Sequence, residues 1–205
     1  MTRTLAIGDV HGCLTPLAAL AEAVPLRPSD TVVMLGDYSS RGPDSRRVHE
    51  WLCDRREVQR AGGGELVTLR GNHEVMLLQS LEDPLAFRSW HSVGGRETLA
   101  SYGREDTDLR EPDWLPDRHQ RLVEDGLRPY FETETHVFVH ASLPPDVPPE
   151  KASNAFLHWE PFNATGRRTS PAKSSSAATP SSGRACRPFA TGASASTPAA
   201  ASAAG

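Results

Sequence analysis

The sequence predicts an α/β fold, and two features of the chain carry this prediction. Short apolar runs lie at residues 5–7, 31–35, 66–69 and 137–139, and each is continuous rather than alternating. Continuous runs of this kind are typical of strands that are covered on both faces of a sheet. Between the first three runs lie stretches in which apolar residues recur at helical spacing. A buried sheet with helices between its strands is the architecture that fits both features.

Three helices are expected after the first three runs. The first begins near Pro16 and ends before Pro25, because proline suits the first turn of a helix but not its interior. The second begins near Pro43 and places its apolar residues on one face. The third covers residues 73–81, and its apolar residues belong to the core.

Polar side chains follow each apolar run at the point where the expected strand ends. Ligands in α/β folds bind in the crevice at the carboxyl ends of the strands. We therefore expect these side chains to converge on one point. They are Asp9, His11, Asp37, Asn72, His73 and His140.

The chemistry of this set favours a metal centre. Carboxylates, an amide oxygen and imidazoles suit Mn, Fe or Zn better than they suit calcium, and they are unlike a thiolate site. The set also holds more ligands than one ion needs. Two ions that share a bridging carboxylate are therefore expected.

Four segments of the chain, taken in order, resemble the motifs of the calcineurin-like metallophosphoesterases. They are Gly-Asp-Val-His-Gly at 8–12, Gly-Asp-Tyr-Ser-Ser-Arg-Gly at 36–42, Gly-Asn-His-Glu at 71–74 and Val-His-Ala at 139–141. Within this family the chain is most similar to the bacterial serine/threonine protein phosphatases, over residues 1 to about 160. The resemblance implies a four-layer sandwich, with two mixed β-sheets flanked by helices and the C-terminal part truncated.

The resemblance also implies the ligands of two divalent ions. Asp9 and His11 would hold one ion, Asp37 would bridge both, and Asn72 and His140 would hold the second. Manganese is the expected metal, with iron, zinc or nickel as alternatives.

The remaining roles implied by the resemblance concern the phosphate group. A water between the ions would attack phosphorus without a phospho-enzyme, and His73 would protonate the leaving group as general acid. Arg41 and Arg70 would bind phosphate oxygens. The alternative for each arginine is an ordinary ion pair. Glu74 is interpreted as a residue at a helix N-terminus that the helix dipole favours.

One residue of the second motif differs from the protein phosphatases, so the motifs do not decide the substrate class. Protein phosphatases of this type have an aspartate directly before the arginine of the second motif, where it orients the catalytic histidine. This chain has Ser40 at that position. The bis(5′-nucleosyl)-tetraphosphatases, which the chain also resembles, lack that aspartate. The first prediction is therefore a serine/threonine phosphatase, and the alternatives are a tetraphosphatase-like hydrolase or a catalytically weakened remnant.

The other histidines have blander interpretations. His91 lies in a segment, residues 90–99, that resembles one near the substrate cleft of the bacterial branch. It is interpreted first as a surface histidine beside a packed tryptophan and second as a substrate contact. The remaining histidines do not follow apolar runs and are expected to be structural or solvated; they are His49, His119, His136 and His158.

Composition limits the partners and the compartment. The net charge is −4 and no block of lysine or arginine is present, so neither nucleic acid nor a membrane is an expected partner. A phosphorylated protein or a small phosphoester is expected instead. The three cysteines are scattered, which is typical of free thiols in a reducing compartment. Because no apolar leader or spanning stretch is visible, a cytoplasmic protein is expected.

The composition changes near residue 166. Residues 1–165 are expected to form an incomplete catalytic domain, whereas 166–205 are rich in Ala, Ser and Pro and are expected to be disordered. The phosphatases that the chain resembles continue with a strand ending in Gly-His-Thr, whose histidine is a metal ligand, and then with Ile-Asp-Thr-Gly. Neither is present. We therefore expect low activity and marginal solubility from this chain.

One hypothesis explains the break as a tail read out of frame. If the reading is shifted by one base and the serines use TCN codons, residues 174–180 permit Val-Val-Val-Cys-Gly-His-Thr. In the same frame, residues 193–199 permit Gly-Val-Cys-Ile-Asp-Thr-Gly. The alternative is a natural Ala/Ser-rich tail.

Overall fold

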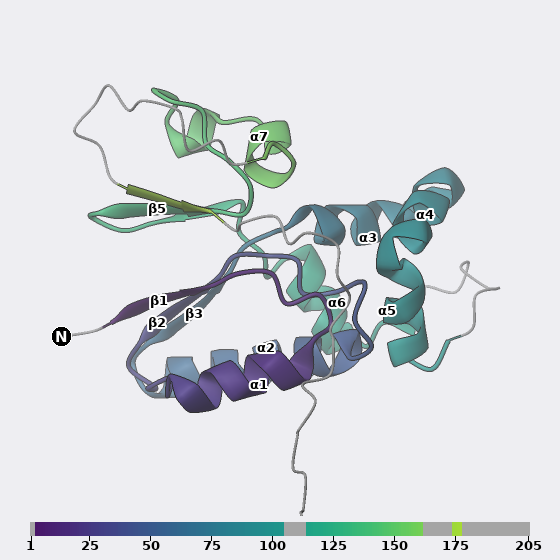
Figure 1. Ribbon diagram of the computed structural model, residues 1–205, viewed down its shortest axis with the longest axis horizontal. Coiled ribbons are helices and arrows are strands. Elements are labelled where there is room, and N and C mark those ends of the chain that lie inside the picture. Colours follow the sequence, from purple (N-terminus) through teal and green to yellow (C-terminus); the bar gives the residue numbers. More distant parts are fainter. Residues whose placement is uncertain (1–2, 105–113, 162–173, 178–205) are drawn as a thin grey trace, which may run out of the picture.

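The computed structural model describes residues 3–104, 114–161 and 174–177, the last four as backbone only. Figure 1 shows two small sheets with helices around them. The elements in chain order are β1 (Thr4–Ile7), α1 (Leu14–Ala23), β2 (Thr31–Met34), α2 (Ser45–Ala61), β3 (Glu65–Thr68), α3 (Asn72–Glu82), α4 (Pro84–Trp90), the π-helical turn η1 (His91–Gly95), α5 (Arg96–Ser101), α6 (Asp117–Glu124), β4 (Tyr130–Glu132), β5 (His136–Val139), the 3₁₀ turn η3 (Pro149–Lys151), α7 (Asn154–His158) and β6 (Ser174–Ala177).

The first sheet has the order β1-β2-β3, and all three strands are parallel. Thr4 pairs with Thr31, and Thr31 pairs with Glu65, so the three strands end level with one another. Helices α1 and α2 make the crossovers that parallel strands require. The strands and helices that the sequence predicted in this half of the chain are therefore confirmed.

Alternate residues of β2 face two different layers. Val32 and Met34 belong to the core cluster that contains Leu52 of α2, so this face packs on the helices. Val33 belongs to a second cluster, which contains Phe138 of β5. The first sheet is therefore covered on both faces, as its continuous apolar runs predicted.

The second sheet has the order β4-β5-β6 and is mixed, because β4 is antiparallel to β5 and β6 is parallel to it. Phe138 faces the first sheet. Val137 and Val139 pack with Leu157 of α7 on the opposite side. The layers are thus α1 and α2, the first sheet, the second sheet and α7, as Figure 1 shows. This arrangement confirms the predicted four-layer sandwich, although in the described residues the first sheet is parallel rather than mixed.

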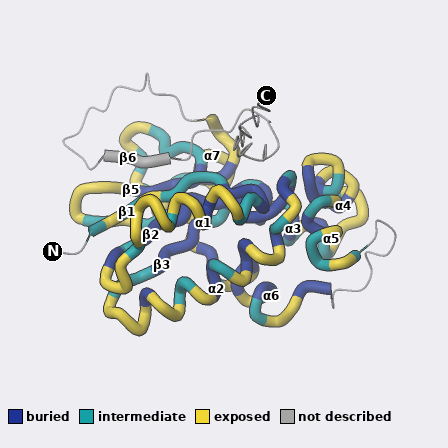
Figure 2. Tube along the Cα trace, turned by 60° about the horizontal axis from the view of Figure 1, so that its bottom comes forward, coloured by how far each residue is buried: buried dark blue, intermediate teal, exposed yellow. Residues whose placement is uncertain are grey.

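The middle of the chain builds a separate helical core beside the sheets. Helices α3, α4, α5 and α6 bury a cluster that includes Leu77, Trp90, Leu99 and Val123. Figure 2 shows α3, α4 and α5 grouped at the end of the molecule away from the N-terminus. This helical group contributes three residues at the start of α3 to the site described below.

Two expectations need correction. Residues 174–177 form β6, so the predicted disorder of the tail is wrong for these four residues. The remainder of that tail, and the boundary near residue 165, lie outside the described residues. Cys53 is a free, buried thiol, but Cys13 is disulfide-bonded, so the expectation of three free thiols is wrong for Cys13. Among the described residues, no helix combines the length and apolar character that a membrane crossing requires.

Candidate active site

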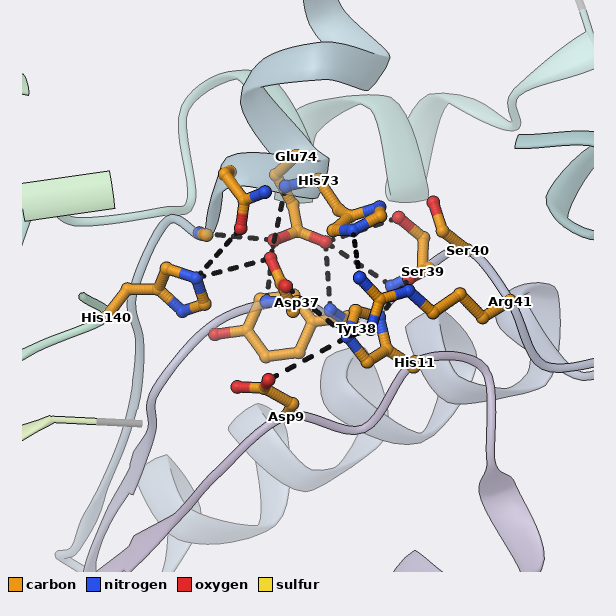
Figure 3. A network of polar contacts seen from close by, with 12 residues as sticks. Asp9, His11, Asp37, Tyr38, Ser39, Ser40, Arg41, His73, Glu74 and His140 are labelled. Atoms are coloured by element: carbon orange, nitrogen blue, oxygen red, sulfur yellow. Dashed lines mark hydrogen bonds and ion pairs between the residues drawn. The ribbon is translucent and has the colours of Figure 1, made fainter. Parts of the chain in front are cut away.

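The structure brings six of the predicted residues together at the carboxyl ends of the strands. Asp9 and His11 follow β1, Asp37 follows β2, and Asn72 and His73 open α3 after β3. His140 arrives from the other sheet, directly after β5. Figure 3 shows the side chains of the labelled members pointing toward one another. The level ends of three parallel strands explain why residues far apart in the sequence meet here.

Unusual backbone conformations at the strand ends allow this close approach. His11 has φ of 46° and Asp37 has φ of 53°, both in the left-handed region. Gly36 has φ of +111°, and a Cβ at that position would lie 2.7 Å from His140 Nδ1 and 2.8 Å from the Gly71 nitrogen. Only glycine fits where the two sheets and the α3 turn meet.

His140 presents an unprotonated nitrogen to the site. Its Nδ1 lies 2.8 Å from the Leu35 carbonyl oxygen, which can only accept a hydrogen bond. Nδ1 therefore carries a proton, and in the neutral ring Nε2 carries a lone pair. Nε2 lies 3.1 Å from Asn72 Oδ1 and 3.5 Å from Asp37 Oδ1. A backbone carbonyl that holds the ring in this way is typical of histidines that ligate metals.

Three acceptor atoms thus face one another around Asn72. With the amide in this orientation, a cation between the three atoms would satisfy all of them. If the amide is turned over, its nitrogen donates to Asp37 Oδ1 at 3.3 Å and to His140 Nε2 at 3.1 Å. The first orientation fits a bound ion and the second fits the site without one. The donor set is therefore suited to a metal.

His11 repeats the pattern on the other side of Asp37. Its Nδ1 lies 3.2 Å from the Ser39 carbonyl oxygen, so Nε2 again carries the lone pair. Nε2 lies 3.4 Å from Asp37 Oδ2 and 3.8 Å from Asp9 Oδ2. The two carboxylate oxygens of Asp37 therefore face different histidines, Oδ1 toward His140 and Oδ2 toward His11. Ligand atoms of His11, Asp37 and His73 all lie within 4.8 Å of one another.

Arg41 bridges two imidazoles at the edge of this group. Its Nη1 lies 3.0 Å from His11 Nε2, and its Nη2 lies 3.2 Å from His73 Nε2. A guanidinium only donates, so both histidine nitrogens accept and both rings are neutral. Burial, and then the charge of Arg41, lowers the pKa of His11 to about 4. Burial, and then His11, lowers the pKa of His73 to about 3.

Asp37 has the opposite shift. Burial, and then the neighbouring Asp9, raises the pKa of Asp37 to about 7. Without a cation, these surroundings therefore disfavour charge on Asp37 as well as on His11 and His73. A divalent cation would reverse the penalty on the acids, because it stabilises the carboxylate form.

Arg70 does not join this group. Its Nη2 donates to the Glu124 carbonyl oxygen at 2.8 Å, at the end of α6. Its backbone nitrogen donates to the Arg128 carbonyl oxygen at 2.8 Å. In the described part of the chain, Arg70 has no hydrogen bond to another predicted site residue. In this structure Arg70 Nη2 therefore points toward α6, and its role as a phosphate ligand stays a prediction.

Glu74 is a site residue that the sequence interpretation missed. It is fully buried, and its carboxylate accepts from the backbone nitrogens of Asp37 at 2.8 Å, Tyr38 at 2.9 Å and Gly71 at 3.2 Å. It also accepts from the backbone nitrogen and the hydroxyl of Ser39. Burial, and then Asp37, raises its pKa. Its spacing of three residues from the helix start matches a capping box, which was the available signal.

The histidines with bland interpretations are not members of this group, although burial, and then the charge of the nearby His140, lowers the pKa of His158. His49 and His119 are buried between α2, α5 and α6, where both contact the Tyr102 hydroxyl. His158 is buried in α7, and His136 is exposed. His91 is half-buried, with its ring 5.3 Å from that of Phe87. These positions agree with structural or solvated roles.

Comparison with known proteins assigns the family. The family model described as calcineurin-like phosphoesterase matches residues 2–169, and the chain therefore belongs to the calcineurin-like phosphoesterases. Enzymes of this family hydrolyse phosphoesters with the help of divalent metal ions.

Two curated proteins are similar to this chain over more than two thirds of its length. The chain is 34% identical over 146 residues to a protein of Pseudomonas putida named symmetrical bis(5′-nucleosyl)-tetraphosphatase, covering 69% of this chain and 43% of that protein. A protein of the same name from Stutzerimonas stutzeri is 32% identical over 151 residues, covering 73% of this chain and 47% of that protein. The chain thus spans less than half the length of these curated relatives.

A solved structure supports the fold. The cold-active protein-tyrosine phosphatase of a psychrophilic Shewanella species matches with a TM-score of 0.54 and 18% identity, over 78% of this chain and 50% of that one. At this identity the match shows the shared fold and nothing about substrate.

Proposed function

We propose that this chain belongs to a metal-dependent hydrolase of bis(5′-nucleosyl) tetraphosphates. The observation that carries the proposal is the identity of 34% and 32%, over more than two thirds of the chain, to proteins named for that activity. This is the alternative, rather than the first prediction, of the sequence analysis. The proposed activity is that of the whole protein, to which this chain contributes the described site.

Two ions would share the site through Asp37. Asp9 and His11 would hold one ion, Asn72 and His140 would hold the other, and Asp37 would be shared by both. Support comes from the lone pairs of both Nε2 atoms and from the two directions in which the Asp37 oxygens face. We propose manganese as the metal, since the donors are mixed oxygen and nitrogen. When bound, the ions would supply an activated water and cationic charge at the phosphorus.

Arg41 would orient the phosphate group. Its guanidinium already donates toward the centre of the site, and a phosphate oxygen can replace either histidine nitrogen as acceptor. Arg70 lies against α6, so Arg41 is the arginine of the described site that we assign to phosphate.

The surroundings of His73 favour an anhydride substrate. A phosphoserine leaves as an alkoxide, which needs a proton, whereas a nucleoside diphosphate leaves readily as an anion. His73 Nδ1 is buried without a hydrogen-bond partner among the described residues, so no carboxylate supports a protonated ring. Ser40, at the position of the expected aspartate, offers only a buried neutral hydroxyl. General-acid catalysis by His73 is therefore less necessary for a tetraphosphate than for a phosphoserine.

Parallel assays test the proposal. The chain, loaded with Mn²⁺, would be given diadenosine tetraphosphate in one reaction and a phosphoserine peptide in another, with chromatography for nucleotides and a dye assay for phosphate. We expect faster release of nucleoside diphosphate from the tetraphosphate. Chelation would abolish this release because it removes the metal. Asp37→Asn would abolish it because the shared ligand is lost. Asp125→Asn, which changes an exposed aspartate at the end of α6, should leave it unchanged.

Each other outcome has a distinct meaning. Faster hydrolysis of the phosphopeptide would favour the protein phosphatase. No hydrolysis of either substrate by a chain that binds Mn²⁺ in calorimetry would favour the weakened remnant. A chain that binds no Mn²⁺ would show that the proposed ligand set is wrong.

A further inference from the structure

The turn that carries Arg41 has an unusual backbone. Ser40 has φ of 72° and Arg41 has φ of 67°, so two consecutive residues that are not glycine adopt the left-handed conformation. Side chains with a Cβ disfavour this region, and such a turn persists only where surrounding contacts hold it. Ser39 and Ser40 are fully buried, so those contacts come from other protein groups.

The contacts come from the middle of the chain. The Ser40 backbone N–H donates to Thr98 Oγ1 at 2.9 Å, across 58 residues of sequence. The Arg41 backbone N–H donates to the Gly94 carbonyl oxygen at 3.2 Å. Both acceptors belong to the continuous η1–α5 segment. Each of the two left-handed residues therefore has its own partner in that segment.

Both acceptors are themselves fixed in place. Thr98 is fully buried, and its Oγ1 also lies 3.2 Å from Ser45 Oγ at the start of α2. Gly94 has φ of +118°, and a Cβ there would lie 2.3 Å from the Arg41 nitrogen. A glycine is thus required where η1 touches the turn. These contacts make the η1–α5 segment a rigid support for Arg41.

We propose that Thr98 is a positioning residue for phosphate binding. With Gly94 it holds the Ser40–Arg41 turn, and the turn aims the Arg41 guanidinium between His11 and His73 (Figure 3). The inference rests on the proposed role of Arg41 toward phosphate. Thr98 touches neither substrate nor metal, and it acts on the phosphate group only through Arg41.

The physical reason is orientation. A guanidinium binds phosphate best through two parallel N–H donors, and this needs a fixed plane. Without the Thr98 acceptor, the Ser40 N–H is buried and unpaired, and the turn gains other conformations. Arg41 then spends less time in the orientation that binds two oxygens, so affinity for phosphate falls.

A matched pair of variants isolates the hydroxyl. Thr98→Val keeps the shape of the side chain and removes the hydroxyl, whereas Thr98→Ser keeps the hydroxyl and removes a methyl group. In the full chain, amide hydrogen exchange of Ser40, measured by NMR, should accelerate about tenfold in Thr98→Val, as expected from one lost hydrogen bond. It should stay near the wild-type rate in Thr98→Ser. Exchange at Val33, in the buried β2, serves as the reference for global stability.

A second experiment tests whether the conformation of the Ser40–Arg41 turn affects phosphate binding. Calorimetry of the Mn²⁺-loaded chain with inorganic phosphate should show affinity about tenfold weaker in Thr98→Val. In an Arg41→Ala background, Thr98→Val should have no further effect, because the residue through which it acts is gone. If the valine variant fails to fold, Thr98→Ala removes the same hydroxyl without a branched side chain.

Three results would overturn the proposal. Unchanged Ser40 exchange in Thr98→Val would show that Thr98 does not hold the turn. Equal losses in the valine and serine variants would indicate packing rather than the hydroxyl. Additive losses with Arg41→Ala would show that Thr98 acts through another group. The hydrogen-exchange measurement does not depend on hydrolysis. A chain that is inactive on diadenosine tetraphosphate would therefore refute the proposed function, and the role of Thr98 would still be tested by hydrogen exchange.

Discussion

Glu74 illustrates at the scale of one residue how a buried charge can organise a site. Its carboxylate collects the N–H groups of the loop that carries Asp37 and those at the start of α3. It thereby sets the distance between Asp37 and Asn72, which approach the same point from different strands. No part of Glu74 needs to touch metal or substrate for this purpose.

Glu74→Gln should destabilise the protein by about 2–3 kcal/mol. The amide has one carbonyl oxygen in place of two carboxylate oxygens. Its NH₂ group would face either the N–H donors of Asp37 and Gly71 or those of Tyr38 and Ser39. Urea denaturation would measure the change. Glu82→Gln, at the exposed end of the same helix, is the control and should stay within about 0.5 kcal/mol of the wild type. Equal stability of the two variants would contradict the anchoring role.

At the scale of elements, a chain of polar groups joins α2, α5 and α6. His119 Nε2 lies 2.8 Å from the Glu50 carboxylate and donates to it, so its Nδ1 accepts from the Tyr102 hydroxyl at 2.8 Å. The Tyr102 oxygen then accepts from His49 Nδ1 at 2.7 Å. This order leaves His49 Nε2 buried and unprotonated, without a partner among the described residues.

The interface should therefore weaken in acid. Burial, and then His119, lowers the pKa of His49 from 6.5 to about 3. Between these values the unfolded chain binds the proton and the folded chain does not, so the free energy of unfolding falls as pH falls below 6.5. His49→Asn keeps a donor for Tyr102 and removes the titrating group. Its pH slope should be shallower by up to about 1.4 kcal/mol per pH unit.

Urea unfolding at several pH values, from about pH 7 to about pH 5, would measure these slopes. His136→Asn, which changes an exposed histidine of β5, is the matched control and should keep the wild-type slope. If His49→Asn has the same slope as wild type, His49 does not contribute the proton uptake assigned to it.

At the scale of the whole molecule, β6 bears on the origin of the tail. The backbone of Ser174–Ala177 pairs in parallel with β5, Ser174 opposite His136 and Ala177 opposite Val139. The shifted reading frame permits Val-Val-Val-Cys at these residues, a sequence with high strand propensity. A strand at this position supports our proposal that the tail is an out-of-frame reading of a missing part of the catalytic domain.

Resequencing the gene from the codon of Trp159 past the stop would test the proposal. We expect one base gained or lost before the codon of Ser174. The restored frame should then read Gly-His-Thr after the strand and Ile-Asp-Thr-Gly further on. A confirmed reading of the present sequence would refute the frameshift and leave a natural Ala/Ser-rich tail.

Some of the site was visible in the sequence because its signals are local. An apolar run followed by Gly-Asp or Gly-Asn-His marks a buried strand and the polar turn at its end. This pattern located Asp9, Asp37 and Asn72, and the parallel arrangement of β1, β2 and β3 brought them together. The four-layer fold followed from the motifs, since their order is that of the family.

Contacts over long sequence distances were not visible. The side chain of Arg70 could have pointed to the site or to α6, and only the tertiary structure shows that its Nη2 donates to the Glu124 carbonyl oxygen. The same holds for Thr98, whose hydroxyl meets Ser40 across 58 residues. No spacing in the sequence encodes such a contact.

By itself, then, the sequence determined the α/β class, the family and the residues that end each strand, because hydrophobic runs and turn residues act over a few positions. The tertiary structure decided which atoms of those residues face one another. The carbonyl oxygens of Leu35 and Ser39 set the tautomers of His140 and His11. Glu74 holds the loop that contains Asp37 and Tyr38. These are directional contacts between distant segments, and they exist only once the layers have packed.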